Sequence, residues 1–173
     1  MPVTLKSGSA FPTMSFDKVG GGTIKVGGDI EKWTLFIVYR GKHCGRCKKY
    51  LNQLEAMQSE WHDANFEIAV VSADTEEKAK ADIAEFGWTF DIGFGLSQVQ
   101  MKQLGLFVST PLSETETDRA FAEPGIFCIT PSGDVQIISV SNGPAVRPDL
   151  VELLDGMIFT IKNDRPARGD LEL

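Results

Sequence analysis

The chain has 173 residues, of which 42% are hydrophobic and 24% are charged, and this composition is ordinary for a single globular domain. Its formal net charge of −7 argues against a general nucleic-acid-binding surface, because neutralising phosphates requires a basic face. No apolar run reaches the roughly 18 residues that a membrane-spanning helix needs. We therefore expect neither nucleic acid nor a membrane among the partners.

The beginning of the chain and its cysteine content both indicate a reducing compartment. The N-terminal stretch MPVTLKSGSAFP lacks the apolar core of a secretory signal peptide. Three cysteines are too few for a disulfide-stabilised secreted scaffold, and their odd number fits reduced thiols. We therefore expect a cytoplasmic protein. There, a close cysteine pair is more often catalytic or metal-binding than structural.

The first third of the chain predicts a β-hairpin, a buried strand and a helix. Segments 14–19 and 23–26 flank three consecutive glycines, which suit the tip of a hairpin. Residues 33–39, WTLFIVY, are apolar except for one threonine, as is typical of a strand covered on both faces. Apolar residues then recur at spacings of three and four over residues 47–61, as on one face of a helix.

Strands and helices alternate through the remainder of the chain. The predicted elements are a strand at 66–71, a helix at 75–86, a short extended piece within 88–96, a helix at 97–104, a loop at 106–123, a hairpin over 125–140 and a helix at 148–161. This order implies an α/β fold with a mixed central sheet and helices on both faces. We expect one domain over residues 1–162 with an N-terminal β-hairpin extension, followed by a polar C-terminal tail over residues 163–173.

Cys44 and Cys47 stand three residues apart, between the first buried strand and the helix that follows it. The first backbone N–H groups of a helix lack intrahelical partners and carry partial positive charge, which lowers the pKa of a thiol placed there. We therefore expect Cys44 to be an exposed nucleophile. Cys47 lies one turn later on the core side and would resolve an oxidised Cys44 within the chain.

Positive side chains gather around this cysteine pair in an otherwise acidic chain. Five of the 17 Lys and Arg residues fall within ten positions, where they would favour a thiolate. They are Arg40, Lys42, Arg46, Lys48 and Lys49. His43 directly precedes Cys44 and has two open interpretations: it tunes the thiolate, or it is a solvated loop residue.

A Cys-x-x-Cys pair can also supply half of a zinc site, which then needs two further ligands. The remaining candidates are His43, His62 and Cys128. Cys128 falls in the middle of a predicted strand, where a free cysteine usually acts as a small core hydrophobe. His62 suits the end of a helix, where a cation is favoured by the helix dipole. We therefore expect no metal site.

With Cys-x-x-Cys at a helix start and a terminal hairpin plus helix, the chain resembles the thioredoxin superfamily. Three segments are similar to its peroxiredoxin branch, the alkyl hydroperoxide reductase and thiol-specific antioxidant group. These are GSAFP at 8–12, VVSADT at 70–75 and GIFCITPSG at 125–133. About residues 3–162 follow this pattern. The resemblance implies a thioredoxin-like fold and a thiol-based oxidoreductase in antioxidant defence and redox homeostasis.

The chain departs from the peroxiredoxin pattern at the active site. That family carries P-x-x-x-T-x-x-C, and here the Pro and Thr positions hold Ile37 and Gly41. The position of the family's arginine falls on Pro124, which instead resembles the cis-proline facing the Cys-x-x-Cys of thioredoxins. A cis-proline would leave the backbone beside it free to pair with an extended peptide substrate. Arg119, in the preceding loop, is a candidate for the missing guanidinium.

These observations predict a Cys44–Cys47 dithiol/disulfide couple that exchanges disulfides or reduces hydroperoxides. It requires no organic cofactor because sulfur carries both electrons, but it does require an external thiol reductant. The expected partners are protein or small-molecule thiols and disulfides, and peroxides; the resemblance also implies pairing as a homodimer. One alternative is a redox-sensing interaction module without turnover, and a zinc-binding protein ranks after it.

Overall fold

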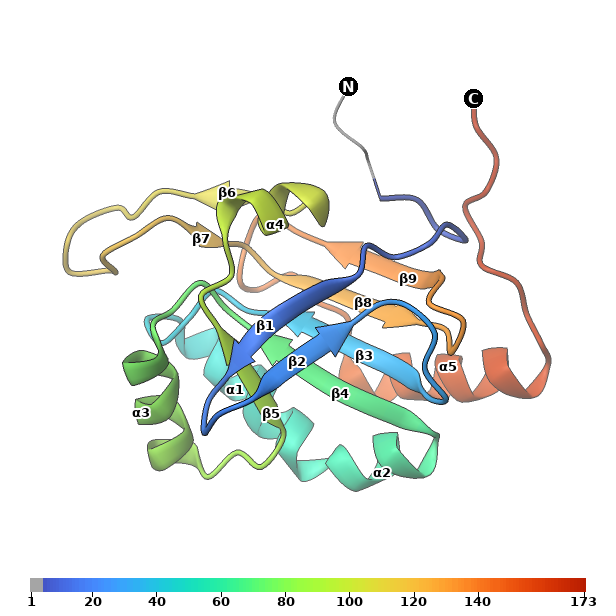
Figure 1. The fold of residues 1–173 in the computed structure, drawn as a ribbon, viewed down its shortest axis with the longest axis horizontal. Coiled ribbons are helices and arrows are strands. Elements are labelled where there is room, and N and C mark those ends of the chain that lie inside the picture. Colours follow the sequence, from blue (N-terminus) through green and yellow to red (C-terminus); the bar gives the residue numbers. More distant parts are fainter. Residues whose placement is uncertain (1–4) are drawn as a thin grey trace.

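A seven-stranded mixed sheet in the order β2-β1-β5-β4-β3-β8-β9 organises the computed structural model, which describes residues 5–173 (Figure 1). β3 (Trp33–Val38) lies inside the sheet, parallel to β4 (Phe66–Val71) and antiparallel to β8 (Gly125–Ile129). β5 (Asp91–Phe94) pairs parallel with β4. This arrangement matches the predicted mixed α/β architecture.

Both predicted hairpins form, one at each edge of the sheet. β1 (Met14–Lys18) and β2 (Thr23–Val26) pair antiparallel. Gly20, Gly21 and Gly22 join them with φ angles of 89°, 101° and 82°, which glycine adopts without steric cost. At the other edge, β9 (Val135–Val140) pairs antiparallel with β8.

Residues 106–123, expected to be a loop, contain a second small sheet. β6 (Val108–Ser109) and β7 (Phe121–Ala122) pair antiparallel, and the chain between them projects from the body at the upper left of Figure 1. Two residues are too few to show an alternating pattern, so the sequence does not predict these strands.

Helices cover the sheet close to where the sequence predicts them. Within residues 5–173 they are α1 (Gly45–Ala56), α2 (Gln58–Asp63), α3 (Glu76–Phe86), α4 (Gln98–Gln103) and α5 (Leu150–Lys162). The stripe expected as one helix over 47–61 is divided at Met57, whose φ of −115° and ψ of 16° lie outside the helical range. No helix in this part of the chain is both long and apolar enough to cross a membrane.

Polar side chains define where three of these helices begin. Thr75, Ser97 and Asp149 each accept a hydrogen bond from a backbone N–H in the first turn of α3, α4 and α5. The last helix therefore starts after Asp149, slightly later than the predicted start at Pro148. α3 ends at Gly87, which has a left-handed conformation with φ of 71°, as the sequence predicts.

Apolar side chains pack on both faces of β3, which confirms the prediction for this strand. Leu35 and Ile37 belong to a core cluster with Cys44 and Cys47, whereas Phe36 and Val38 belong to a second cluster on the other face. These four side chains are fully buried.

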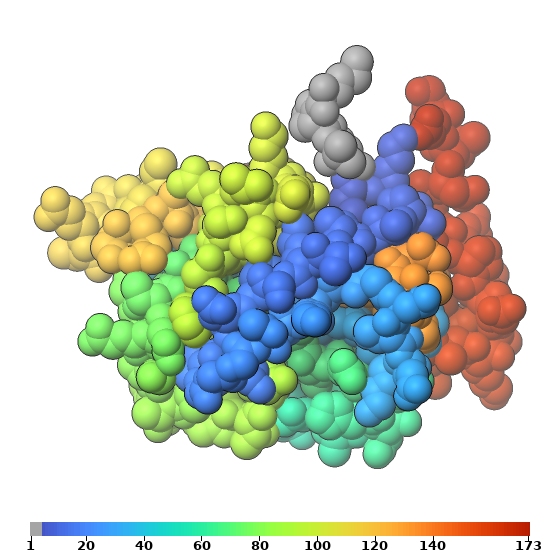
Figure 2. All heavy atoms as spheres, in the orientation of Figure 1, coloured from blue at the N-terminus to red at the C-terminus, as the bar shows by residue number. Residues whose placement is uncertain are grey.

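Figure 2 shows the N-terminal segment, in blue, across the visible face of the molecule. The chain after α5, in red, lies along the right-hand side of the same view.

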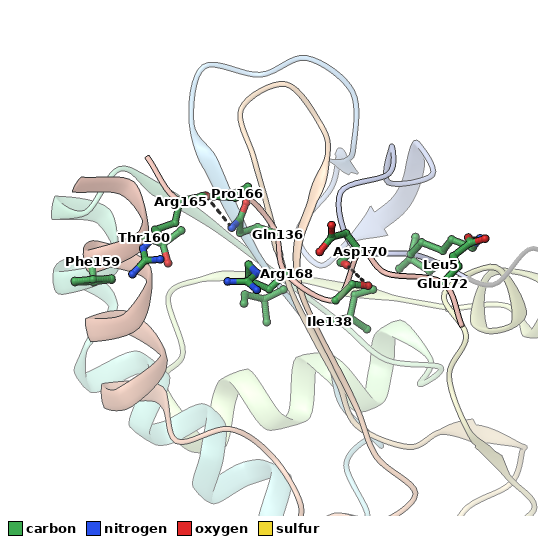
Figure 3. A pocket seen from close by; sticks show the side chains of 14 residues that line it. Leu5, Gln136, Ile138, Phe159, Thr160, Arg165, Pro166, Arg168, Asp170 and Glu172 are labelled. Carbon is green, nitrogen blue, oxygen red and sulfur yellow. Dashed lines mark hydrogen bonds and ion pairs between the residues drawn. The ribbon is translucent and has the colours of Figure 1, made fainter. Parts of the chain in front are cut away.

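The C-terminal segment after α5 passes beside β9 and the N-terminal segment. Gln136 Nε2 donates a hydrogen bond to the Arg165 carbonyl at 3.3 Å, and Ser7 Oγ donates to the Gly169 carbonyl at 3.3 Å. These segments line a cavity of about 730 Å³ (Figure 3). The start of β9 lies across β8 from the start of β3, whereas the cysteines follow the end of β3. This cavity therefore lies at the opposite end of the sheet from the cysteines.

Candidate functional site

The cysteine pair lies where β3 ends and α1 begins. The turn before it is closed by a hydrogen bond from the Cys44 N–H to the Gly41 carbonyl at 3.1 Å. Cys44 is the N-cap residue of α1, and its Sγ accepts a hydrogen bond from the Cys47 N–H at 3.2 Å. The sulfur therefore occupies the place where a helix offers unpaired N–H groups to an anion.

Both sulfurs belong to free thiols, and both are buried. The exposed fraction is 3% for Cys44 and 0% for Cys47. The burial of Cys47 matches its predicted core-facing position. The burial of Cys44 corrects the expectation of an exposed thiol, because its side chain packs into the core cluster that also contains Tyr39 and Leu51.

Arg147 is a site residue that sequence reasoning does not find. It lies in the segment between β9 and α5, and its Nη2 is 2.8 Å from Cys47 Sγ and 3.9 Å from Cys44 Sγ. The sequence separation of 100 and 103 positions hides this contact. The one local signal is an arginine directly before the predicted last helix, and such an arginine has many other uses.

Neighbouring groups hold the Arg147 guanidinium in place. Its Nε donates a hydrogen bond to the Pro144 carbonyl at 3.0 Å, and its Cζ lies 5.1 Å from the centre of the Tyr50 ring. The Tyr50 hydroxyl in turn donates to the Pro148 carbonyl at 2.7 Å, which ties α1 to the segment that carries Arg147. A cation over an aromatic face is attracted by the ring quadrupole.

The two thiols have opposite pKa shifts. The pKa of Cys44 falls from an ordinary 9.0 to about 5, mainly because it accepts a hydrogen bond from the Cys47 thiol. Burial opposes this shift, while the Cys47 N–H, Arg40 and Arg147 add to it. Burial, followed by the hydrogen bond to Cys44, raises the pKa of Cys47. At neutral pH the pair therefore shares one proton, with Cys44 as the thiolate and Cys47 as the thiol.

The five cations around the pair divide into two groups. Arg40 Nε lies 3.0 Å from Glu123 Oε2, and Lys48 Nζ lies 3.7 Å from Oδ1 of the buried Asp82, so these two cations are neutralised locally. The other three have no ion pair or side-chain hydrogen bond within residues 5–173. They are Lys42, Arg46 and Lys49.

His43 packs against the chain rather than into solvent. Its ring centre lies 4.5 Å from that of Phe121 in an edge-to-face arrangement, and both ring nitrogens are buried with no hydrogen-bond partner in the described part of the chain. This placement contradicts the interpretation of His43 as a solvated loop residue. Burial, with the nearby Arg40 charge, lowers the pKa of His43, so the imidazole is neutral at pH 7. Tuning of the thiolate by His43 stays a prediction.

Pro124 does not have the conformation that the resemblance to thioredoxins implies. Every peptide bond within residues 5–173 is trans. The backbone beside Pro124 is also already paired: the Glu123 N–H donates to the Phe107 carbonyl at 2.8 Å, and the Pro124 carbonyl accepts from the Ser141 N–H at 3.1 Å. The small β6–β7 sheet and the end of the β8–β9 ladder use these groups. They are therefore not free for an extended peptide.

Arg119 does not supply the missing guanidinium. It pairs with its neighbour Asp118 at 3.1 Å and donates to the Ala73 carbonyl at 3.4 Å. Neither cysteine is among its hydrogen-bond partners. Arg147, from a different segment, takes the position beside the sulfurs that Arg119 was expected to fill.

Gly41 occupies the position of the threonine in the P-x-x-x-T-x-x-C pattern. Its backbone conformation and its contact with a neighbouring carboxylate explain why a larger residue is disfavoured there. Its φ is 133°, and a Cβ atom at this position would lie 2.7 Å from Asp74 Oδ1. Asp74 Oδ2 accepts a hydrogen bond from the Lys42 N–H at 2.7 Å and thereby holds the turn before Cys44.

Within residues 5–173, no group of three His, Cys, Asp or Glu side chains could hold a metal ion.

The chain is similar to known proteins both in a family sequence pattern and in fold. Residues 7–138 match the model of the AhpC/TSA family. A peroxiredoxin-like protein from Aquifex aeolicus is 15% identical with a TM-score of 0.75, over 88% of this chain and 86% of that chain. The reduced 2-Cys peroxiredoxin of Plasmodium vivax is 17% identical with a TM-score of 0.73, over 91% and 82%.

AhpC from Mycobacterium bovis is also similar, with 16% identity and a TM-score of 0.74 over 99% of this chain and 100% of that chain. No curated protein sequence matches at a significant level. Likeness at these identities concerns the fold, and it confirms the predicted thioredoxin-like fold class.

Proposed function

The chain belongs to the AhpC/TSA family and is a thiol-dependent oxidoreductase, and from this premise we propose that it reduces hydroperoxides through a Cys44–Cys47 couple. The observation that carries the proposal is the position of Arg147, whose Nη2 lies 2.8 Å from one sulfur and 3.9 Å from the other. A single guanidinium can stabilise negative charge first on the attacking sulfur and then on the resolving one.

The first step consumes the thiolate of Cys44. Its sulfur attacks the nearer peroxide oxygen, the O–O bond breaks, and Cys44 becomes a sulfenic acid. The alkoxide that leaves must take a proton. Cys47 holds one within hydrogen-bond reach of Cys44, and its loss creates a second thiolate beside Arg147.

The second step forms the disulfide. The Cys47 thiolate attacks the sulfur of the Cys44 sulfenic acid, and hydroxide leaves and takes a proton from solvent to become water. Two electrons have then passed from the dithiol to the peroxide, which is released as an alcohol and water. An external thiol must return these electrons before the next turnover.

Two observations favour a peroxide over a protein disulfide as the oxidant. The backbone groups of Glu123 and Pro124 that could pair with an extended peptide are already hydrogen-bonded within the chain. Cys44 is buried, with an exposed fraction of 3%, which suits a small oxidant better than a folded protein. Because the couple must be kept reduced between turnovers, the cytoplasm is part of this proposal.

Rapid-quench mass spectrometry of the fully reduced protein mixed with hydrogen peroxide tests the proposal. We expect loss of both thiols far faster than for an ordinary free thiol, and a sulfenic acid trapped on Cys44 in the Cys47→Ser protein. Cys44→Ser should react no faster than a free thiol. Slow oxidation of the wild-type protein would reject peroxide reduction and leave disulfide exchange as the function of the couple.

A further inference from the structure

A small pocket with positive charge is lined in part by Arg147, the residue whose guanidinium contacts both sulfurs. It has a volume of about 260 Å³ and lies between the first turns of α1 and the segment that precedes α5. Arg46, Lys49 and Arg147 contribute three cations to its lining. Among the described lining residues the one carboxylate is Asp149, whose Oδ1 already accepts a hydrogen bond from the Glu152 N–H at 2.9 Å as the cap of α5.

The cations of this pocket have unused capacity to bind an anion. Arg46 and Lys49 make no ion pair within residues 5–173. Arg147 uses Nε and Nη2 for the Pro144 carbonyl and the sulfurs, but its Nη1 is buried and has no hydrogen-bond partner among residues 5–173. A buried unpaired donor costs free energy that an incoming acceptor recovers.

The positive charge of this pocket contrasts with the negative net charge of the chain. The chain carries a net charge of −7, which repels anions in general. A second cavity, of about 380 Å³, borders the residues just before Cys44 and is lined by Lys42 and Lys78 but also by Asp74 and Glu116. The charges lining that cavity are balanced, so of these two pockets the one lined by Arg147 is the more favourable for an anion.

We propose that the pocket lined by Arg46, Lys49 and Arg147 binds the carboxylate of a small anionic thiol, and that this thiol is the reductant of the Cys44–Cys47 disulfide. The inference rests on the proposed function, which leaves a disulfide that an external thiol must reduce. The volume of the pocket suits a carboxylate on a short carbon chain. A carboxylate held by Arg147 would bring an attached thiol close to both sulfurs.

Reduction then takes two thiols. The first, as a thiolate, attacks Cys44 Sγ, the protein disulfide breaks, and Cys47 leaves as a thiolate beside Arg147 and takes a proton. The second thiolate attacks the mixed disulfide on Cys44. A small-molecule disulfide leaves, and Cys44 returns to the thiolate form with its two electrons.

A pair of alkylating reagents tests the pocket independently of any peroxide or disulfide chemistry. Iodoacetate and iodoacetamide are nearly equal in size, and iodoacetate carries the carboxylate. The reduced protein is treated with each, alkylation of Cys44 is located by mass spectrometry, and the iodoacetate-to-iodoacetamide rate ratio is divided by the ratio for 2-mercaptoethanol. We expect a normalised ratio of about ten or more, since local charge commonly raises such rates by roughly 10- to 1,000-fold.

Variants that each remove one positive charge distinguish binding of the carboxylate in the pocket from a general electrostatic attraction of the anionic reagent. The normalised ratio should fall toward one in the Arg46→Gln and Lys49→Gln proteins and stay high in Lys42→Gln, which removes the same charge outside the pocket. A change in the amount or the reactivity of the Cys44 thiolate alters both alkylation rates by the same factor, so it cancels in their ratio. An equal fall in Lys42→Gln, a wild-type ratio near one, or no alkylation of Cys44 by either reagent would overturn the proposal.

A second arm tests the reductant with the oxidised protein. The thiolate form of 3-mercaptopropionate should reduce the Cys44–Cys47 disulfide about ten times faster than that of 2-mercaptoethanol, and Lys49→Gln should remove this advantage. Equal rates for the two thiols would overturn the claim about the reductant. If peroxide forms no disulfide at all, the proposed function fails, and the alkylation ratio still decides whether the pocket binds a carboxylate.

Discussion

Arg147 reaches the cysteine pair from the segment before α5, and its charge acts on both sulfurs. We predict that Arg147→Gln raises the pKa of Cys44, because a nearby positive charge is lost. Oxidation of Cys44 at neutral pH should slow by about 10- to 100-fold, because the guanidinium no longer stabilises negative charge on the sulfurs during the reaction, an interaction worth roughly 1.5–3 kcal/mol. The pH dependence of Cys44 alkylation by iodoacetamide measures the pKa. Arg119→Gln is the control, and an equal effect there would contradict the assignment.

The lowered pKa of Cys44 also couples folding of the reduced protein to pH. Folding lowers this pKa from an ordinary 9.0 to about 5, so between these values the unfolded chain binds more protons than the folded one. The contribution of Cys44 to stability is therefore largest near pH 9 and is lost as the pH falls through about 5.

Urea unfolding of the reduced wild-type and Cys44→Ser proteins at pH 5, 7 and 8.5 measures this linkage. The difference in their free energies of unfolding should grow in favour of the wild type as the pH rises. A difference that is constant with pH would show that Cys44 is not held as a thiolate.

Gly41 is required by the backbone and by its neighbour. Its φ of 133° is strained for any residue with a Cβ, and that Cβ would lie 2.7 Å from Asp74 Oδ1. We predict that Gly41→Ala lowers the free energy of unfolding by about 1–3 kcal/mol. Gly45→Ala is the matched control, because a Cβ at Gly45 would meet nothing within 4 Å and its φ is not positive. Urea denaturation of both variants distinguishes them.

At the scale of elements, α1 is joined to the segment before α5 by one aromatic side chain. The Tyr50 hydroxyl donates to the Pro148 carbonyl at 2.7 Å, and the Tyr50 ring lies under Arg147. We predict that Tyr50→Phe lowers the free energy of unfolding by about 1 kcal/mol, the typical net value of a hydrogen bond. Because the ring remains, the pKa of Cys44 should change less than in Arg147→Gln. A larger shift in Tyr50→Phe would show that the hydroxyl, not the ring, positions the guanidinium.

Elements with a strong local pattern are the ones that the sequence predicts well. The continuous apolar run of β3 and the turn between β8 and β9 are each specified within a few residues, and so is the cap at Ser97. The break at Met57 is not predicted, because the apolar stripe continues through it into α2. The same holds for β6 and β7, where pairing between distant residues outweighs any local preference.

The candidate site also combines features that the local sequence predicts with features that depend on residues distant in the sequence. The N-cap position of Cys44 depends on residues next to it in the sequence, and the spacing alone predicts it. The internal pairing of the backbone at Glu123 and Pro124 depends on Phe107 and Ser141, which only the folded chain brings near. The contact with Arg147 depends on how the last helix packs, and no local pattern records that.

At the scale of the whole molecule, the C-terminal segment and the cysteine pair lie at opposite ends of the sheet. We predict that removal of residues 166–173 leaves the rate of Cys44 alkylation unchanged. It should lower the free energy of unfolding by no more than about 1 kcal/mol, because the interactions that it removes are exposed, namely the hydrogen bond of Ser7 to Gly169 and the ion pair of Lys6 with Glu172. Alkylation kinetics and urea denaturation of the shortened protein measure both quantities. A slower Cys44 would show that the two ends are coupled.

The close packing of Gly41 against Asp74 restricts the order in which this candidate site could change during evolution. A threonine at position 41 would collide with the carboxylate, and loss of that carboxylate alone would leave the Lys42 N–H without its partner. Each single step lowers stability, so the two positions are expected to change together or not at all. A lineage with this pair is therefore separated by a fitness valley from one with a threonine before the cysteine, and the double replacement should be better tolerated than the sum of its parts.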